Sequence, residues 1–363
     1  MRTNRALHSD LAIPPGEYLA EVINELGMSQ VDVARRMGRP VQAINEIIKG
    51  HKAITPDTAL QLEQVTGVPA ALWTGLEEEY RLVLARQQEH AQLAEEAELV
   101  DPALYRAMAK LGWVKHVRDK LEKVREFWKF FGVASLHNLP EVTTYSPAFR
   151  LSTAAVASSY ALAAWLRQGE LEARKIEVYP YEAERLKSAL ASLRALTIET
   201  PEVFLPQAQT LLARCGVALI VLPHLPKTYA HGATFWLTPS KAVVQMSLRG
   251  SWADIFWFSL FHELAHVLLH SKRHMFIEGK GGEDPAWRTQ EDEANSFAGD
   301  VLIPPGPYRA FTGQGLFTAG AIRQFAAQRG IAPGVVVGRL QHDGFIEQNQ
   351  VNGLRERYRW AGA

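Results

Sequence analysis

The residues His262, Glu263 and His266 form the pattern His-Glu-x-x-His, which can do metal chemistry. Positions four apart share one face of an α-helix, so His262 and His266 can bind one zinc ion while Glu263 reaches a water beside it. Residues 255–268 are otherwise almost all apolar, which predicts a buried helix. Chance matches and core histidines that only satisfy a carbonyl are the ordinary alternative, but ionisable groups on a buried helix need a reason. The pattern therefore predicts the site of a zinc-dependent peptidase.

Two histidines leave a tetrahedral zinc ion one protein ligand short. Residues 290–305 have small and apolar side chains at a helical period, with three acidic residues at the start. On this helix Glu291 falls near the inner stripe, Glu293 on its flank and Asp292 on the far side. We expect Glu291 to be the third ligand, with Glu293 in reserve. Asn295, one turn after Glu291, is expected to hydrogen-bond a ligating imidazole.

His270 continues the four-residue spacing beyond His266. Its Cα lies about 6 Å further along a straight helix, too far for three histidines to bind one ion. The sequence also lacks the glycine that turns the chain toward a third histidine in the longer His-Glu-x-x-His-x-x-Gly-x-x-His pattern. We expect His270 to be structural or to contact a ligand rather than the metal.

Elements that would position these residues are predicted on both sides. Residues 216–223, 231–237 and 242–248 are rich in branched side chains and predict strands of a small sheet. Residues 121–131, 181–196 and 321–340 predict helices. The fold class expected is α+β, mostly α, with a zincin-like C-terminal domain that combines a small sheet with the helix of the His-Glu-x-x-His pattern.

The N-terminal segment predicts a helix-turn-helix. Ser29 is placed to cap one helix, Gly38 gives a tight corner, and residues 41–50 form the second helix. With this helix in the major groove, one set of side chains would contact base edges and another set would contact phosphates. The residues expected at base edges are Gln42, Asn45 and Glu46, and those expected toward phosphates are Gln30, Arg39 and Lys49.

The charge on this segment favours a local DNA-docking face. The whole chain has 39 basic and 39 acidic residues among 363, so it has no global attraction for nucleic acid or acidic lipid. Residues 29–52 carry five basic and two acidic residues, a net charge of +3. The alternative is a helical module that binds protein instead of DNA.

Cysteine usage and hydropathy point to the cytoplasm. Cys215 is the single cysteine, so an internal disulfide is excluded. We find no apolar leader and no charge-free run of the ~18 residues that a membrane span needs. We expect a cytoplasmic protein without a membrane partner.

Residues 14–84 resemble HigA-type antitoxins of the Xre helix-turn-helix class. The resemblance lies in Pro14-Pro15-Gly16-Glu17, in Ser29-Gln30, in the run from Gly50 to Ala59, and in Trp73. It implies a regulator that represses its own operon and is often paired with a toxin. The docking helix here follows Arg39-Pro40, so the operator sequence does not carry over.

Residues 149–342 resemble the ImmA/IrrE family of zinc metallopeptidases. The matching runs are Phe149-Arg150-Leu151-Ser152, Ala164-Trp165-Leu166-Arg167, Ser247-Leu248-Arg249, Phe261 to His266 and Glu291 to Pro304. The resemblance implies a peptidase that in some relatives cleaves a repressor. It also favours Glu291, because the family's acidic ligand precedes an Ala-Asn-x-Phe-Ala run at this offset.

Together these observations predict four segments: a DNA-binding domain at 1–85, a helical connector at 86–200, a metallopeptidase domain at 201–345 and a C-terminal tail at 346–363. We expect a transcriptional repressor and antitoxin with Zn²⁺ as cofactor. Its expected partners are operator DNA, bound as a homodimer, and a cognate toxin or regulatory protein that the zinc domain senses or cleaves. Two alternatives stay open: a dedicated protease that cleaves a repressor or toxin, and a non-catalytic zinc sensor that controls DNA binding.

Overall fold

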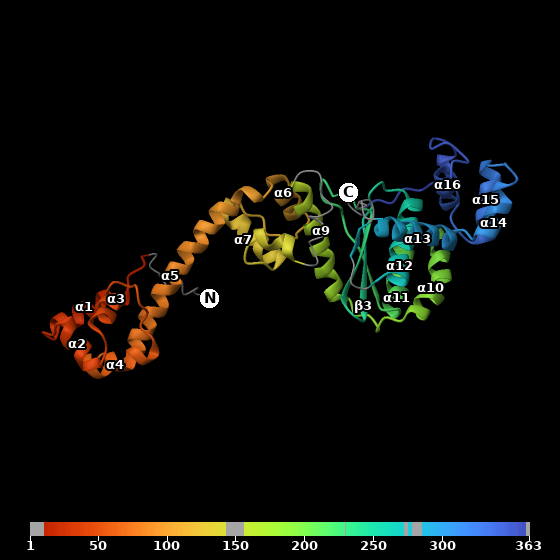
Figure 1. Cartoon of the computed structure of the whole chain (residues 1–363). Helices are drawn as coiled ribbons and strands as arrows, with labels where there is room; N and C mark the ends of the chain where they lie inside the picture. The colour runs from red at the N-terminus through yellow and green to blue at the C-terminus, as the bar shows by residue number, and fades with distance from the viewer. Residues whose placement is uncertain (1–10, 143–155, 229, 272–274, 278–284, 361–363) are drawn as a thin grey trace. The chain divides into compact units, whose positions relative to one another are not determined.

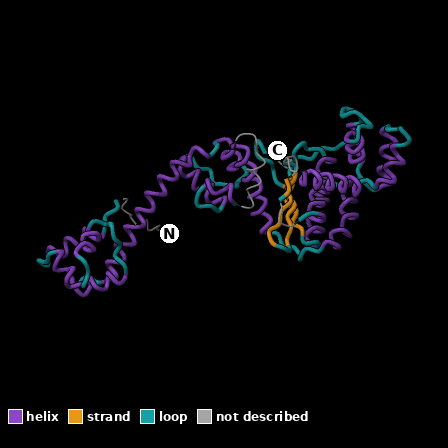
Figure 2. The backbone as a smooth tube through the Cα atoms, viewed as in Figure 1, coloured by secondary structure: helices purple, strands orange, loops and turns teal. Residues whose placement is uncertain are grey.

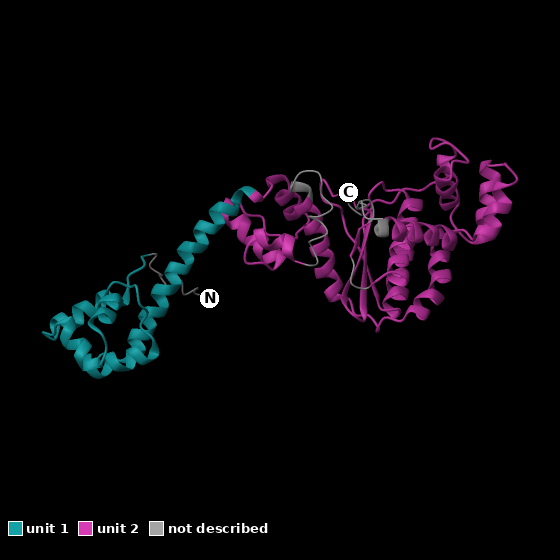
Figure 3. Cartoon of the chain, in the orientation of Figure 1, with its two compact units in different colours: residues 1–98 teal, residues 99–363 magenta. Residues whose placement is uncertain are grey.

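The computed structural model describes residues 11–142, 156–228, 230–271, 275–277 and 285–360. The run Phe149-Arg150-Leu151-Ser152 of the family resemblance lies outside these residues. The chain divides into two compact units, Met1–Glu98 and Leu99–Ala363 (Figure 3). Among the described residues, no helix combines the length and apolar character that crossing a bilayer requires.

The first unit is all helical, as predicted (Figure 1). Ser29 Oγ accepts a hydrogen bond from the Asp32 backbone amide, and the Ser29 amide donates to Asp32 Oδ2 in return, a capping box that starts the second helix. Gly38 ends that helix at φ 65°, which makes the tight corner predicted for the helix-turn-helix. Trp73 is fully buried at the centre of the unit's core. The helices are α1 Pro15–Glu25, α2 Gln30–Met37, α3 Val41–Ile48, α4 Pro56–Thr66 and α5 Ala70–Glu96.

Helix α5 is continuous over 27 residues, from Trp73 in the core of this unit into the region that the sequence assigns to the helical connector. Nothing in the segment stops a helix, and Gly75 is only a weak breaker in its interior. Glu77 fixes the start of α5 to this unit, because its Oε2 accepts the Ile54 amide at 3.0 Å. The helix then continues into the short 3₁₀ turn η1 Ala97–Leu99.

The second unit begins with helices and then builds a four-stranded sheet. These helices are α6 Pro102–Lys110, α7 Lys120–Phe131, η2 Leu136–Glu141, α9 Val156–Lys175, α10 Ala183–Ala195, η3 Leu196–Ile198 and α11 Pro201–Arg214. The strands are β1 Val217–Val221, β2 Gly232–Thr238, β3 Lys241–Met246 and β4 Phe276–Ile277. Their order is β1-β3-β2-β4, with β1 parallel to β3 and the other two pairs antiparallel.

Helices lie over both faces of the sheet (Figure 2). Alternate side chains of the strands pack on these two layers of helices. Val217, Leu219 and Val244 belong to the core that contains helix α12 Ala253–Leu269. Ala218 and Val243 point to the other face, where they pack on α9 through Ala173. The mostly helical fold with a small sheet is therefore confirmed.

Of the remaining helices, α13 and α16 pack against α12, and the segment that follows α16 returns to α12. These remaining helices are α13 Pro285–Leu302, α14 Pro305–Thr312, α15 Ala319–Arg329, α16 Pro333–His342 and η4 Asn352–Leu354. Tyr358 is 6% exposed, and its hydroxyl accepts a hydrogen bond from Trp257 Nε1 at 2.9 Å. Arg357 forms a β-bridge with Trp252 just before α12. The described part of 346–363 therefore packs on the helix that carries the two histidines.

Gly16 supplies a test of the packing of α1 on α3. A Cβ at Gly16 would overlap the carbonyl oxygen of Ile47 and the backbone of Ile48. We predict that Gly16→Ala destabilises the unit by about 1–3 kcal/mol, because the backbones must move apart. Hydrogen exchange of the α1 and α3 amides in the full chain should become correspondingly faster.

Gly75→Ala is the matched control, since Gly75 is also helical and a Cβ there meets nothing within 4 Å. Its amide exchange should stay the same or slow slightly, because alanine favours helix by up to about 1 kcal/mol. Equal effects of the two substitutions would contradict the close approach of α1 and α3.

Candidate metal centre

Helix α12 is buried because apolar side chains surround it on nearly every side. Leu260, Phe261 and Leu264 are completely covered, so the helix fits only between other elements. His262, Glu263 and His266 are 1%, 0% and 2% exposed on the same helix. Three ionisable groups thus lie in the most apolar part of the unit, where each needs a partner.

Three side chains converge at one point, two from α12 and one from α13. The Nε2 atoms of His262 and His266 lie 3.0 Å apart. Glu291 approaches them with Oε2 at 3.3 Å from His262 Nε2 and Oε1 at 3.6 Å from His266 Nε2. Within the described residues these three form a group that could hold a metal ion. Glu291, which the sequence favours as third ligand, lies in this group.

Hydrogen-bond partners on the outer side of each ring determine where its proton sits. His262 Nδ1 lies 3.0 Å from Asn295 Oδ1, an acceptor, so this nitrogen carries the proton and donates it. His270 Nε2 lies 3.1 Å from the Glu293 carboxylate and must likewise donate. His266 Nδ1 lies 2.8 Å from His270 Nδ1, and we place the proton of this contact on His266. Both Nε2 atoms at the centre are then left as lone pairs.

The charge state of His266 agrees with this assignment. Burial, followed by the neighbouring rings of His262 and His270, lowers the pKa of His266 from 6.5 to about 2. His266 is therefore neutral at physiological pH and has a single proton, which the hydrogen bond places on Nδ1. Its ring also stacks on Phe276 of β4, with centroids 4.1 Å apart, so its orientation is fixed.

Two lone pairs and a carboxylate facing one another are a poor arrangement unless a cation lies among them. Glu291 Oε1 is buried and has no hydrogen-bond partner among the residues that the structure describes. Two imidazoles and a carboxylate are also a common ligand set of catalytic zinc, which leaves further positions open. The residues present therefore fit a zinc ion on geometry, on proton placement and on ligand type.

Glu263 lies beside the centre and is held by strand β2. Thr234 Oγ1 donates to Glu263 Oε2 at 2.6 Å, and Thr234 itself is 1% exposed. A Cβ at Gly232 would come within 2.5 Å of Glu263 Oε1, so the carboxylate lies directly against the strand backbone. The absence of a side chain at Gly232 is what gives Glu263 its place.

Glu293, the reserve ligand, points elsewhere. Its side chain is 56% exposed and contacts His270 Nε2 at 3.1 Å, so it lies on the outer side of the histidine row. Asn295 contacts His262 as the sequence suggests, and His270 contacts His266 rather than the convergence point. The chain Glu293, His270, His266 therefore orients one candidate ligand, as Asn295 orients the other.

The sequence did not point to Thr234, Phe276 or the His270–Glu293 pair. Thr234 lies in a predicted strand, but only the packing of that strand on α12 brings it to Glu263. The spacing of His270 from His266 was the one available signal, because i and i+4 side chains touch on a helix.

In the first unit, four of the predicted DNA-contact residues form one polar row at the surface of α2 and α3. Gln42 Nε2 donates to Glu46 Oε1 at 2.9 Å, and Asn45 Nδ2 lies 3.5 Å from Gln30 Oε1. These side chains hold one another in a pre-formed array.

The two cations predicted at phosphates behave differently. Lys49 is exposed at the end of α3. Arg39 is turned toward α4, where its Nε donates to Gln61 Oε1 at 2.6 Å and its Nη2 lies 3.5 Å from Asp57.

Two family models match separate parts of the chain. A helix-turn-helix model matches residues 19–73, and an IrrE N-terminal-like domain matches residues 255–328. The second range contains α12 with His262, Glu263 and His266, and α13 with Glu291.

Two known proteins are each similar to about a fifth of this chain. Virulence-associated protein I of Dichelobacter nodosus is 35% identical over 81 residues, which are 22% of this chain and 75% of that protein. The uncharacterised HTH-type transcriptional regulator YddM of Escherichia coli K12 is 29% identical over 73 residues, 20% of this chain and 78% of that protein.

Among solved structures, an addiction module antidote protein of the HigA family from Coxiella burnetii is 32% identical and has a TM-score of 0.22. The match covers 25% of this chain and 97% of that one. Pseudomonas aeruginosa antitoxin HigA, solved with the higBA promoter, is 28% identical with a TM-score of 0.23, covering 26% and 100%. By its family models and its similarity to virulence-associated protein I, the chain belongs to the Xre-type helix-turn-helix family and joins that module to an ImmA/IrrE-type peptidase-like domain.

Proposed function

We propose that the chain is a DNA-binding transcriptional regulator whose C-terminal unit is a zinc-dependent metallopeptidase. One observation carries the peptidase half: two imidazole Nε2 atoms and a carboxylate converge beside a buried glutamate. The match to the IrrE N-terminal-like domain over the same helices supports it.

In this proposal His262, His266 and Glu291 hold the zinc ion, and Asn295 orients His262 through its 3.0 Å contact. When bound there, zinc supplies Lewis acidity toward water and toward a peptide carbonyl. Glu263 takes a proton from the attacking water and returns it to the leaving amine. Thr234 holds the Glu263 carboxylate in the position from which it does both.

The helix-turn-helix half binds operator DNA in this proposal. Gln42, Asn45 and Glu46 on α3 face base edges, where amide and carboxylate groups match the donor and acceptor pattern of the major groove. Gln30 and Lys49 contact phosphates, and Arg39 reaches them by leaving its contacts with Gln61 and Asp57. A symmetric operator requires two copies of the chain, so we propose a homodimer.

We assign the chain the role of a repressor of its own operon and an antitoxin, because residues 14–84 resemble HigA-type antitoxins. The zinc unit would sense or cleave a cognate toxin or regulatory protein in the cytoplasm. A dedicated protease and a non-catalytic sensor are the competing functions. Complete burial of Glu263 beside the candidate ligands favours catalysis over sensing, because a purely structural zinc site has no use for it.

Glu263→Gln tests the catalytic assignment. We predict that the substitution lowers peptide cleavage by about 10²–10⁴-fold, since an amide cannot accept the proton, while one zinc ion per chain is retained. Products from a proteome-derived peptide mixture, identified by mass spectrometry, give the cleavage rate.

Asp292→Asn is the matched control, because Asp292 is an exposed acid on α13. This variant should cleave like the wild type. Wild-type cleavage by Glu263→Gln would show that another group moves the proton.

Glu291→Gln and Glu293→Gln distinguish the two candidate third ligands. Loss of an outer hydrogen-bond partner typically weakens metal binding about 10–100-fold, which is the effect expected for Glu293→Gln. Glu291→Gln should weaken zinc binding further, because a direct anionic ligand is lost. Competition with a chromogenic chelator measures both constants. The reverse order would assign the ligand role to Glu293.

Asn45→Ala and Lys49→Ala separate base contacts from phosphate contacts. On DNA from immediately upstream of the coding frame, Asn45→Ala should weaken the binding free energy by about 1–3 kcal/mol and relax the preference for one base pair. Lys49→Ala should weaken binding to all sequences alike and reduce the slope of the logarithm of the binding constant against the logarithm of salt concentration by about 1.

Gln64→Ala on α4 is the control, since Gln64 is an exposed amide outside the α2–α3 pair. Equal losses with Gln64→Ala and Asn45→Ala in a fluorescence titration would exclude α3 as the DNA-reading helix.

A further inference from the structure

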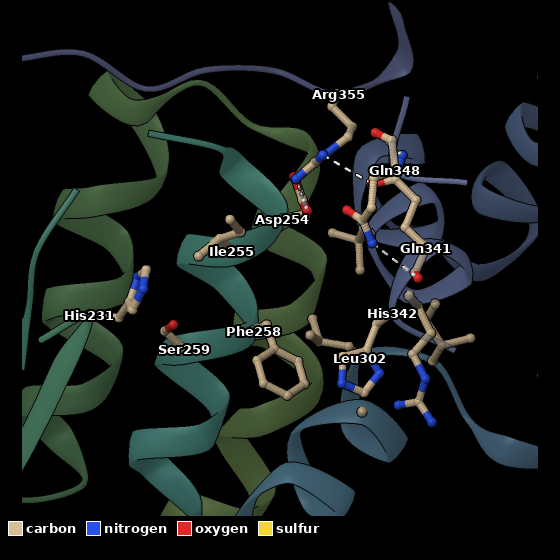
Figure 4. Close-up of a pocket in the computed structure, with 15 residues that line it drawn as sticks. His231, Asp254, Ile255, Phe258, Ser259, Leu302, Gln341, His342, Gln348 and Arg355 are labelled. Atoms are coloured by element: carbon tan, nitrogen blue, oxygen red, sulfur yellow. Dashed lines mark hydrogen bonds and ion pairs between the residues drawn. The ribbon is translucent and has the colours of Figure 1, made fainter. Parts of the chain in front are cut away.

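A cavity of about 310 Å³ lies beside the N-terminal half of α12 (Figure 4). Ligand pockets usually measure about 300–1,000 Å³, so this cavity suits one large side chain better than a cofactor. Its walls come from α12, α13 and α16, together with His231, Ile303, Gln348 and Arg355. The apolar lining residues are Ile255, Phe258, Leu302, Ile303 and Val335.

The cavity lies on the same face of α12 as the candidate metal centre. Phe258 precedes His262 by four residues, one helical turn, and their ring centroids are 6.3 Å apart. On the other side, the cavity is bordered by His231. The next residue, Gly232, lies against Glu263.

One helical turn is about 5.4 Å, and an extended peptide advances about 3.3 Å per residue. A peptide whose carbonyl lies at the centre therefore has a neighbouring side chain within reach of the cavity.

Charged groups at the end of the cavity neutralise one another. Asp254 accepts two hydrogen bonds from Arg355, of 2.9 and 2.8 Å, and the side chains are 7% and 8% exposed. Arg355 also donates to Gln341 Oε1 at 3.1 Å. Gln341 Nε2 in turn donates to the Gln348 carbonyl oxygen at 3.2 Å.

Arg339, at the rim, is paired with Asp343 at 2.7 Å. A charged or strongly polar side chain that entered the cavity would lose its hydrogen bonds to water, and it would gain no new ones from these groups because they are already paired. An apolar side chain has no such hydrogen bonds to lose, and the burial of its surface stabilises the complex.

The C-terminal segment builds this end of the cavity. The guanidinium carbons of Arg355 and Arg357 lie over the Trp252 ring, at 4.3 and 4.0 Å from the centroid, and the Ala253 amide donates to the Glu356 carbonyl oxygen at 2.9 Å. These contacts tie residues 355–358 to the start of α12. The segment predicted as a tail thus supplies a wall of the cavity.

We propose that this cavity receives a large apolar side chain, aromatic or branched aliphatic, from the residue of the polypeptide substrate next to the cleaved bond. The inference rests on the peptidase activity proposed above and adds its specificity. Phe258, facing Leu302 and His342 in Figure 4, forms the wall nearest the candidate ligands. Its ring and that of His342 are stacked with centroids 6.4 Å apart, which offers a flat apolar surface.

Two readouts test the cavity separately from hydrolysis. Zinc-loaded full-length protein is titrated with N-acetyl hydroxamates of alanine, leucine, phenylalanine and aspartate, whose hydroxamate group binds zinc without being cleaved. The leucine and phenylalanine compounds should bind about tenfold or more tightly than the other two. Sites cleaved in a proteome-derived peptide mixture, with Glu263→Gln as the blank, should show the same preference beside the cleaved bond.

Val335→Ala and Val337→Ala form a matched pair on α16. Both valines are buried, 5% and 0% exposed, but only Val335 lines the cavity. Val335→Ala should shift the preference in hydroxamate binding and the preference at cleaved sites toward larger side chains by about tenfold. Val335→Phe should shift both preferences toward alanine. Val337→Ala should leave both unchanged although it removes the same two methyl groups.

The outcomes separate the two proposals. Selective hydroxamate binding that follows the Val335 variants, with no cleavage by the wild type, would support the cavity as a binding site for an apolar side chain and would refute the peptidase and, with it, the specificity assigned to the cavity. Cleavage without an apolar preference, or equal shifts with Val335→Ala and Val337→Ala, would overturn the cavity and leave the peptidase standing. Neither cleavage nor a preference among the hydroxamates would overturn both.

Discussion

The C-terminal unit is organised around three electron-pair donors that face one another with no proton among them. The outer hydrogen bonds of both histidines place their protons on the Nδ1 atoms, so His262 Nε2, His266 Nε2 and Glu291 present only lone pairs inward. Such an arrangement in a buried place is unfavourable without a cation. A cation turns the same arrangement into a source of stability, because metal binding to a formed site adds to the free energy of folding.

The elements packed around α12 hold these three donor groups in position. Alternate residues of the sheet cover one face of the helix, and β2 contributes Thr234 to hold Glu263. Strand β4 is two residues long, yet its Phe276 stacks on His266 and sets the angle of the ring. Helix α13 approaches closely through Ala294 and Ala298, both fully buried, and this brings Glu291 to the histidines. Small side chains at these positions are what permit a carboxylate on one helix to reach imidazoles on another.

Local patterns in the sequence predicted the parts of the site that depend on one element. The spacing of His262 and His266 and the acidic start of α13 follow from helical periodicity, and the capping box at Ser29 follows from adjacent residues. The parts that depend on packing were not predictable. Thr234 and Glu263 are 29 positions apart, β4 is too short for an alternating pattern, and Arg355 reaches Asp254 across 101 residues. The side-chain contacts of Arg39 with α4 likewise arise only when the helices have packed.

The central claim, a metal ion held by two imidazoles and a carboxylate, is tested most directly by X-ray absorption at the zinc edge on the purified full-length chain. The account predicts one zinc ion per chain, nitrogen and oxygen neighbours at about 2.0–2.2 Å, and the multiple-scattering features of two imidazoles. Absence of a bound ion at one equivalent of added zinc, or sulfur in the coordination sphere from Cys215, the single cysteine, would contradict it.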